Sequence, residues 1–309
     1  SAVAKHLRGL KEQGTIEVFA KGRSRICTLK QLEKTHLELS VNGTGSIDEM
    51  EVYLQFVKPR LTNCCDSAAN ILEYGFTEML NNVCDHSGAT KVSIDIIRTA
   101  ISTTIAIIDN GVGIFRKVKE ALGLPDERLS LLELSKGKFT TDPANHTGEG
   151  IFFTCRACDR FAIYSNNLVF THLDSSRDLL DTVPEFGDLP GTIVLMNINN
   201  NSNKRLKQVF DTFSSVDDGF SKTEVPVKLV QYENEGLTSR SQAKRLLARI
   251  DRFKYITLDF EGIHFVGQAF ADQIFRVFAT AHPDLEIRYK NANEEIVRTI
   301  KTAQNNTVE

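Results

Sequence analysis

The chain has 309 residues, a length that allows two or three domains with separate cores. Hydrophobic residues make up 41% and charged residues 25%, as in ordinary globular proteins, and a net charge of −3 gives no strong reason to expect a polyanionic partner. The sequence has no apolar run near the ~20 residues that span a bilayer, no basic-then-apolar leader, and no cysteine pattern typical of secreted proteins. We therefore expect a cytoplasmic protein.

Positive charge gathers at the start of the chain, where residues 1–30 carry seven Lys or Arg against two Glu. Apolar residues at helical spacing predict a helix over residues 1–13, and two β-rich runs, 15–19 and 24–29, predict a hairpin with a basic turn. Together they resemble the recognition helix and wing of a winged helix-turn-helix domain, of which only the last part is present. A small amphipathic helix with a solvated hairpin is the alternative. The resemblance implies contacts with duplex DNA from Lys5, Arg8, Lys21, Arg23 and Arg25.

Residues 31–60 are expected to form a connector, with a turn-rich stretch at 42–45 and a short helix over 47–57. A long helix is predicted over residues 67–86, and one of its sides carries Glu78, Asn82 and His86 at four-residue spacing, with Asp85 beside them. Glu78 could take a proton from an attacking water, and the amide oxygen of Asn82 suits Mg²⁺. Taken alone, however, the pattern favours a solvated helix face.

A second motif follows predicted strands over residues 91–98 and 103–109. The apolar run 105–108 ends in Asp109, which is followed by Gly111 and Gly113, so a buried strand delivers a carboxylate into a double-glycine turn. A carboxylate can accept a hydrogen bond from the exocyclic amine of adenine, and glycines let the backbone approach a planar base. By itself this motif is weak, because many tight turns share it.

A third motif lies in a predicted loop over residues 135–150, directly before a helix that ends near Cys158. Backbone amides at a glycine-rich helix start bind phosphate, and Lys136 and Lys138 could neutralise its charge; the alternative is a flexible loop with ordinary capping. Cys155 and Cys158 form a CxxC pair that we interpret as buried structural thiols, since no second pair completes a zinc site. Strands are predicted over 161–165, 168–171 and 192–198.

In this order the segments resemble the ATP-binding GHKL superfamily shared by type II topoisomerases, heat-shock chaperones, mismatch-repair ATPases, sensor histidine kinases and anti-sigma-factor kinases. The resemblance covers about residues 61–200 and implies a Bergerat-type α/β sandwich that binds ATP and Mg²⁺. It makes Glu78 the general base and Thr192 the support of the adenine-binding Asp109. The short lid suits the kinase-like branch, but a phospho-acceptor His just before the domain is absent, which disfavours autophosphorylation on His. The nucleotide-binding residues predicted are Asn82 (also the Mg²⁺ ligand), Asp85, His86, Asp109, Gly111, Gly113, Lys138, Thr147, Gly148, Glu149, Gly150 and Thr192.

The last third alternates predicted strands (225–230, 255–260, 285–289) with predicted helices (239–252, 266–279, 292–303), which indicates a small layered sheet. Residues 256–272 resemble the STAS-like domain (DUF4325-type) that follows such ATPase domains in bacterial regulators. That domain is related to anti-sigma-factor antagonists, which carry a phosphorylatable Ser where the helix starts. Here residues 266–269 contain no hydroxyl side chain, so we expect a packing and protein-interaction domain.

The predicted fold class is thus α/β in four parts: a partial winged helix (1–30), a connector (31–60), a GHKL-type ATP-binding domain (61–200) and a STAS-like domain (201–309). The expected function is that of a bacterial-type cytoplasmic regulator that binds Mg-ATP and hydrolyses it to control its domain arrangement and its DNA or protein partners. Two alternatives stay open. One is a Ser/Thr protein kinase of the anti-sigma-factor type, and the other is a DNA-binding transcription regulator with ATP as ligand only.

Overall fold

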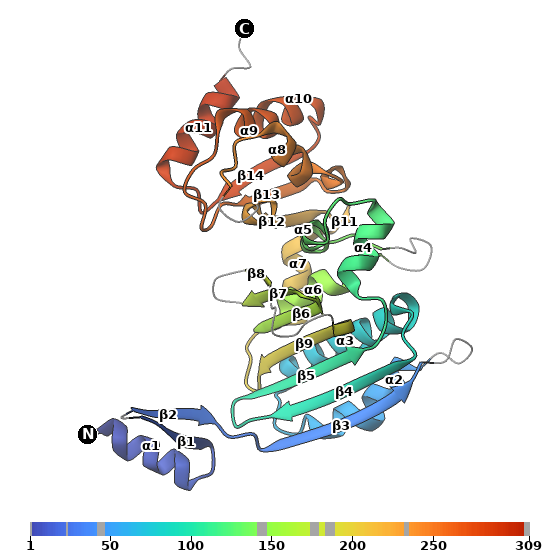
Figure 1. Ribbon diagram of the computed structural model, residues 1–309, viewed down its shortest axis with the longest axis vertical. Coiled ribbons are helices and arrows are strands. Elements are labelled where there is room, and N and C mark those ends of the chain that lie inside the picture. Colours follow the sequence, from blue (N-terminus) through green and yellow to red (C-terminus); the bar gives the residue numbers. More distant parts are fainter. Residues whose placement is uncertain are drawn as a thin grey trace.

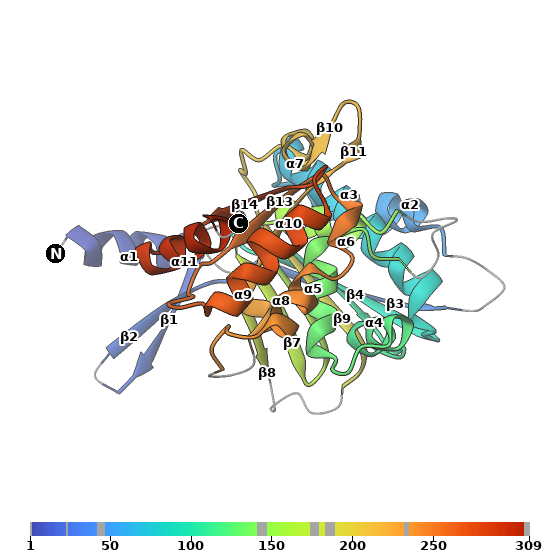
Figure 2. The same ribbon diagram turned by 90° about the horizontal axis from the view of Figure 1, so that it is seen from above.

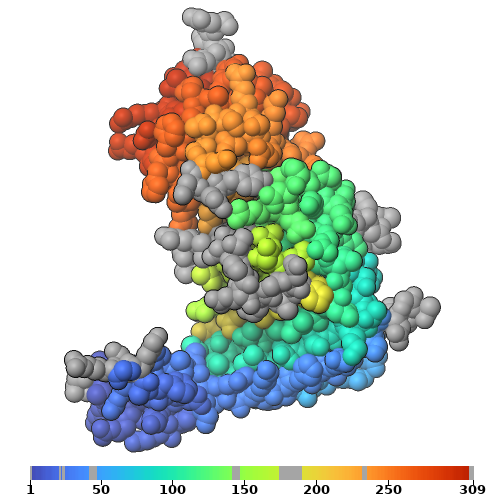
Figure 3. All heavy atoms as spheres, in the orientation of Figure 1, coloured from blue at the N-terminus to red at the C-terminus, as the bar shows by residue number. Residues whose placement is uncertain are grey.

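The computed structural model describes residues 2–22, 24–41, 47–140, 147–173, 179–182, 189–231 and 235–305. They form three parts in chain order along the longest axis of the molecule (Figure 1). The space-filling view shows the N-terminal part projecting from one end, with the C-terminal part at the other (Figure 3). The molecule combines helices with β-sheets, as the predicted α/β class requires. The turn-rich stretch 42–45 lies outside the described ranges.

The N-terminal part consists of α1 (Ala2–Glu12) and a hairpin of β1 (Ile16–Lys21) and β2 (Ser24–Leu29). Gly14 ends the helix with a φ of 71°, which glycine adopts without steric cost. The strands pair from Ile16 opposite Leu29 to Lys21 opposite Ser24, as predicted. Figure 2 shows this part standing away from the rest of the molecule. Because α1 buries none of its residues, this part has almost no core of its own.

The central part is built on a seven-stranded antiparallel sheet. Its alternating apolar residues face α3 (Asp66–Asn82), which lies with α2 (Glu49–Val52) behind the sheet in Figure 1. The pairing of β5 with β9 places Ile108 opposite Ile193, so the end of one strand meets the start of the other. In spatial order the strands are β3 (Glu33–Ser40), β4 (Lys91–Arg98), β5 (Ser102–Asp109), β9 (Leu189–Asn199), β6 (Arg160–Asn166), β7 (Leu168–Leu173) and β8 (Leu179–Thr182).

Strand β3 differs from the expectation that residues 31–60 only connect domains. It forms the edge of the central sheet and pairs with β4 along its whole length. Its exposed positions are polar, and His36 Nδ1 lies 2.6 Å from Asp95 Oδ1 on the neighbouring strand. Charged side chains are common on edge strands, where they prevent pairing with other chains. Because every second residue of β3 is polar, the sequence of residues 33–40 resembles that of a linker, and the strand was not predicted.

Helices α4 (Ile114–Leu122), α5 (Arg128–Lys136) and α6 (Gly150–Ala157) complete the central part. Helix α5 was not predicted, because residues from 135 onward were expected to form a loop and those just before it were not assigned. Every residue from Leu129 to Lys136 is buried, including Glu133 and Lys136. A helix covered on all sides lacks the one-sided apolar pattern that sequence analysis detects.

The C-terminal part has a parallel sheet of β12 (Lys222–Pro226), β13 (Tyr255–Asp259) and β14 (Glu286–Lys290). Parallel strands need crossover connections, and α8 (Arg240–Leu247) and α9 (Gln268–Asp272) lie on them. Helix α9 continues through residues 273–278 into α10 (Ala279–Ala281), and α11 (Glu294–Asn305) ends the part. The predicted alternation is confirmed except at its first strand, which was expected over 225–230: β12 ends at Pro226, and Val227–Val230 form a 3-10 helix. The chain reaches this part through three elements that were not predicted: α7 (Leu206–Phe213), β10 (Ser214–Ser215) and β11 (Gly219–Phe220).

Candidate functional site

A cavity of about 290 Å³ lies in the central part, between α3, the end of β5, α4, the segment 134–140 and the start of α6. Its walls come from segments more than 100 residues apart, which only the fold brings together. Ten of the residues predicted to act on the nucleotide line it: Glu78, Asn82, His86, Asp109, Gly113, Thr147, Gly148, Glu149, Gly150 and Thr192.

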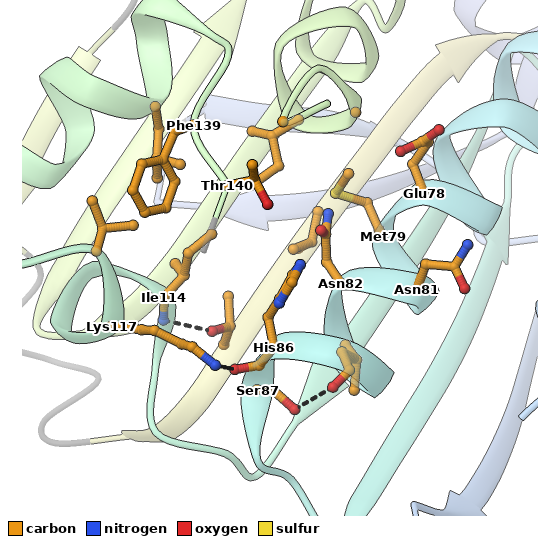
Figure 4. Close-up of a pocket in the computed structure, with 18 of the residues that line it drawn as sticks. Glu78, Met79, Asn81, Asn82, His86, Ser87, Ile114, Lys117, Phe139 and Thr140 are labelled. Carbon is orange, nitrogen blue, oxygen red and sulfur yellow. Dashed lines mark hydrogen bonds between the residues drawn. The ribbon is translucent and has the colours of Figure 1, made fainter. Parts of the chain in front are cut away.

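Helix α3 supplies the long wall. Its apolar stripe is buried against the sheet, so the opposite side is left to face the cavity. Glu78, Asn82 and His86 follow one another at successive turns along this wall (Figure 4). The last of them lies in a π-helical turn, Val83–Ser87, which ends at Gly88 with a φ of 65°. Asp85 is exposed and outside the lining, unlike its predicted placement at the nucleotide.

Asp109 ends β5 and is buried at the floor of the cavity. The backbone amide of Gly111 donates to its Oδ1 at 2.7 Å. Burial raises the pKa of the Asp109 carboxyl, and hydrogen bonds from Gly111 and Thr192 oppose this rise. Gly191 packs so closely on Asp109 that a Cβ atom there would lie 2.0 Å from its backbone oxygen. Gly111 does not line the cavity, so its role in the structure is to hold the carboxylate.

Thr192 joins two walls of the cavity. It lies next to Asp109 in the β5–β9 pairing, and its hydroxyl accepts a hydrogen bond from the Ile114 amide at 3.0 Å. That bond fixes the first turn of α4, directly after Gly113, whose φ is 85°. A Cβ at Gly113 would lie 2.6 Å from Ser165 Oγ, so only glycine fits.

The start of α6 closes the other end of the cavity. Gly150 opens the helix beside Glu78, since a Cβ on Gly150 would lie 2.1 Å from Glu78 Oε2. Gly148 has a φ of 72° and packs against the backbone of Phe139. Glu149 lies between the two glycines, and burial raises the pKa of its carboxyl. The arrangement puts a carboxylate, Glu78, directly beside a glycine-rich helix start.

The two lysines expected to neutralise phosphate lie elsewhere. Lys138 Nζ donates to the backbone oxygen of Arg252 at 2.9 Å, and Lys136 is buried with its Nζ 2.9 Å from Glu133 Oε1. Neither lysine lines the cavity. Their sequence position next to the glycine-rich loop suggested phosphate binding. Each lysine instead donates to a backbone oxygen of the C-terminal part more than 100 residues away, Lys136 to Ala248 and Lys138 to Arg252.

Several lining residues were missed. Lys117 on α4 donates to the His86 backbone oxygen, and Phe139 and Thr140 form the wall opposite α3 (Figure 4). Together with Ile114, Phe139 makes this wall apolar. A signal existed for Lys117, which lies at helical spacing after the double-glycine turn. Phe139 carried none, because it lies in a segment that the sequence predicted to be a loop.

The predicted DNA-binding side chains are only partly described. Lys5 and Arg8 on α1 and Arg25 on β2 are exposed. The side chain of Lys21 and all of Arg23 lie outside the described residues. The buried sites of Cys155 and Cys158 agree with their interpretation as structural thiols.

Residues 242–297 match the family model of a STAS-like domain of unknown function (DUF4325). Residues 242–297 therefore form a STAS-like domain within the C-terminal part. This confirms the prediction made from residues 256–272, and the match includes β13, α9 and β14. A search of curated proteins gave no match. Among the described helices, none has the length and hydrophobicity needed to cross a membrane.

Proposed function

We propose that the cavity binds Mg-ATP in a Bergerat-type α/β sandwich of the GHKL superfamily, and that the protein hydrolyses the nucleotide. The observation that supports this most is that a single cavity collects Glu78 and Asn82 from one helix, Asp109 from a strand end and Gly148 and Gly150 from a second helix start. A buried acceptor, a polar helix wall and a glycine-rich helix start match the three parts of the nucleotide: base, metal-bound phosphates and terminal phosphate.

At the base-binding end, the Asp109 carboxylate would accept a hydrogen bond from the exocyclic amine of adenine. Its own position is held by the Gly111 amide, and the missing side chain of Gly191 leaves room for it, since a Cβ there would lie 2.7 Å from Asp109 Oδ1. The apolar side chains of Ile114 and Phe139 would cover the faces of the purine. A buried site built for one donor rejects bases that lack it, because its acceptor would be left unpaired.

At the phosphate end, Glu78 would take the proton of the attacking water. As the water oxygen bonds to the terminal phosphorus, the bond to ADP breaks and the proton passes to the carboxylate. The donors facing this end are oxygens of carboxylate and amide groups, which fit a hard ion, and Asn82 would hold Mg²⁺. The ion, when bound, supplies charge neutralisation for the phosphates.

The decisive experiment incubates the full chain with labelled ATP and Mg²⁺, and follows products by thin-layer chromatography and mass spectrometry. ADP with free phosphate supports hydrolysis. Labelled protein would instead support the kinase alternative of the anti-sigma-factor type. If ATP binds but stays unchanged, the protein is a regulator with ATP as ligand only. If ATP does not bind, the proposal is wrong.

We propose as a second function that the N-terminal part binds duplex DNA with its helix and hairpin, as the recognition helix and wing of a winged helix would. It is supported by the exposure of Lys5, Arg8 and Arg25 on a part that projects from the body. Binding should weaken steeply with salt, since each phosphate contact releases counterions. A variant with Arg8 and Arg25 both changed to Glu should lose affinity and show a shallower salt dependence. Unchanged binding by this variant would refute the assignment.

A further inference from the structure

A reciprocal pair of hydrogen bonds joins the wall of the cavity to the STAS-like domain. Arg252 Nη1 donates to the Lys138 backbone oxygen at 3.0 Å, and Lys138 Nζ donates to the Arg252 backbone oxygen at 2.9 Å. The Lys138 ammonium also lies 4.7 Å from the ring centre of Phe253. Lys138 has a φ of 57°, which a non-glycine residue keeps only when its surroundings enforce it.

The residue after Lys138 forms the wall itself. Phe139 lines the cavity, and its backbone is in such close contact with Gly148 that a Cβ there would lie 2.4 Å from the Phe139 oxygen. Gly148 in turn lies two residues before Gly150, which packs against Glu78. A continuous chain of contacts therefore runs from Arg252 to the two glycines at the phosphate end.

The wall segment and the helix that follows it are also packed closely against the C-terminal part. Gly137 fits closely against Phe220, and a Cβ on it would lie 2.8 Å from that ring. Phe152 and Phe153 of α6 belong to the core of the C-terminal part, with ring centres 4.6 Å and 4.9 Å from Phe220. Both ends of the described wall, 137–140 and 147–153, are thus held by the same domain.

We infer that Arg252 is a positioning residue for the nucleotide site: through Lys138 it holds the wall segment 137–140 in the conformation that binds the phosphates and the base. This inference rests on the proposed function and assigns its control to the STAS-like domain. A domain that holds the wall only in one arrangement couples its own state to nucleotide affinity, and the coupling acts in both directions.

The test uses the full chain and four variants, of which Lys138→Ala removes the ammonium that donates to Arg252. Arg252→Ala removes the donor to Lys138, and Arg252→Lys keeps one. Arg298→Ala is the matched control, because Arg298 carries the same charge in the same domain but lies exposed on α11. Calorimetry measures the affinity for Mg²⁺ with a non-hydrolysable ATP analogue, and hydrogen exchange measures the amides of residues 134–140 without nucleotide. Thermal unfolding checks that each variant is folded.

Arg252→Ala should weaken nucleotide binding by about 5- to 150-fold, the usual range of coupling between sites, and speed exchange in the wall. Arg252→Lys should recover most of the affinity, and Arg298→Ala should equal the parent. Parent-like affinity in a folded Arg252→Ala variant would overturn the inference. So would a loss of affinity in Lys138→Ala with parent-like exchange in the wall, because that result indicates direct phosphate binding by Lys138. If Arg252→Ala does not fold, Lys138→Ala decides, because it removes the other hydrogen bond of the reciprocal pair: parent-like affinity and parent-like exchange in that variant overturn the inference. If the parent binds no nucleotide, the proposed function fails, and hydrogen exchange alone decides the inference. Faster exchange confined to residues 134–140 in Arg252→Ala supports positioning by Arg252, and exchange equal to that of the parent refutes it.

Discussion

Replacement of Gly150 by Ala tests the catalytic end of the site through its tightest contact. The new Cβ would lie 2.1 Å from Glu78 Oε2 and 2.9 Å from Glu78 Cδ, well inside contact distance. Its neighbour is the flexible end of a side chain, and Gly150 has an ordinary backbone conformation. The carboxylate therefore moves while the helix stays in place, and the protein should remain folded.

The expected loss follows from the distance. To reach a normal separation the carboxylate must move by roughly 1 Å, and a misplacement of that size costs about 100-fold in rate. The upper limit is the whole contribution of a general base, about 100- to 10,000-fold. The affinity for Mg-ATP should change little, because the base-binding end is untouched and alanine keeps the backbone amide at the helix start.

The assay is phosphate release at saturating Mg-ATP, paired with calorimetric affinity. Glu78→Gln is the reference for complete loss of the base and should keep its affinity. In the Glu78→Gln background, Gly150→Ala should lower turnover no further. If Gly150→Ala slows turnover equally in both backgrounds, Glu78 is not the group through which Gly150 acts, and the reasoning is wrong.

Three further variants probe the base-binding end and the packing. Asp109→Asn should lose about 1.5–3 kcal/mol of binding free energy in calorimetry. Because burial raises the pKa of Asp109, its carboxylate should become protonated, and the parent should lose nucleotide affinity, at a pH above the ordinary carboxyl range; the affinity of the variant should not depend on pH there. Gly75→Ala brings a methyl group 2.8 Å from Thr154 Cγ2 and should cost about 1–3 kcal/mol in denaturant unfolding, while wild-type-like stability would contradict the close α3–α6 packing. The hydrogen bond from Arg276 lowers the Asp272 pKa, so this carboxylate stabilises the fold above the unfolded value of about 3.9 and loses the effect as pH falls through its lowered folded pKa. Asp272→Asn should flatten the acid limb of a melting-temperature series, and an unchanged limb would refute the assignment.

Local patterns in the sequence predicted what depends on neighbours in the chain. The pitch of one helix was enough to predict that Glu78, Asn82 and His86 share a side, and the end of one strand was enough to predict the position of Asp109. The alternation in the C-terminal part likewise predicted its strands and helices, since each element carries its own period.

Features that depend on distant partners were not predictable in this way. Residues 33–40 are polar on one side because they form a sheet edge, which the sequence alone does not reveal. Lys138 follows a glycine, as a phosphate-binding lysine would, but its partner Arg252 lies 114 residues further along the chain. The sequence predicted that Lys138 neutralises phosphate, whereas in the structure its ammonium donates to a backbone oxygen of the C-terminal part.

The placement of Phe152 and Phe153 has a consequence for how the protein folds. Both residues lie on α6, the helix that starts at the nucleotide cavity, but their rings belong to the hydrophobic core of the C-terminal part, together with Leu132. The boundary near residue 200 that the sequence suggests is therefore not a place where the chain can be cut, because either fragment would expose apolar surface that the other covers. The two domains should melt in one cooperative transition. Substitutions on the two sides of the shared core should have non-additive effects on the free energy of unfolding.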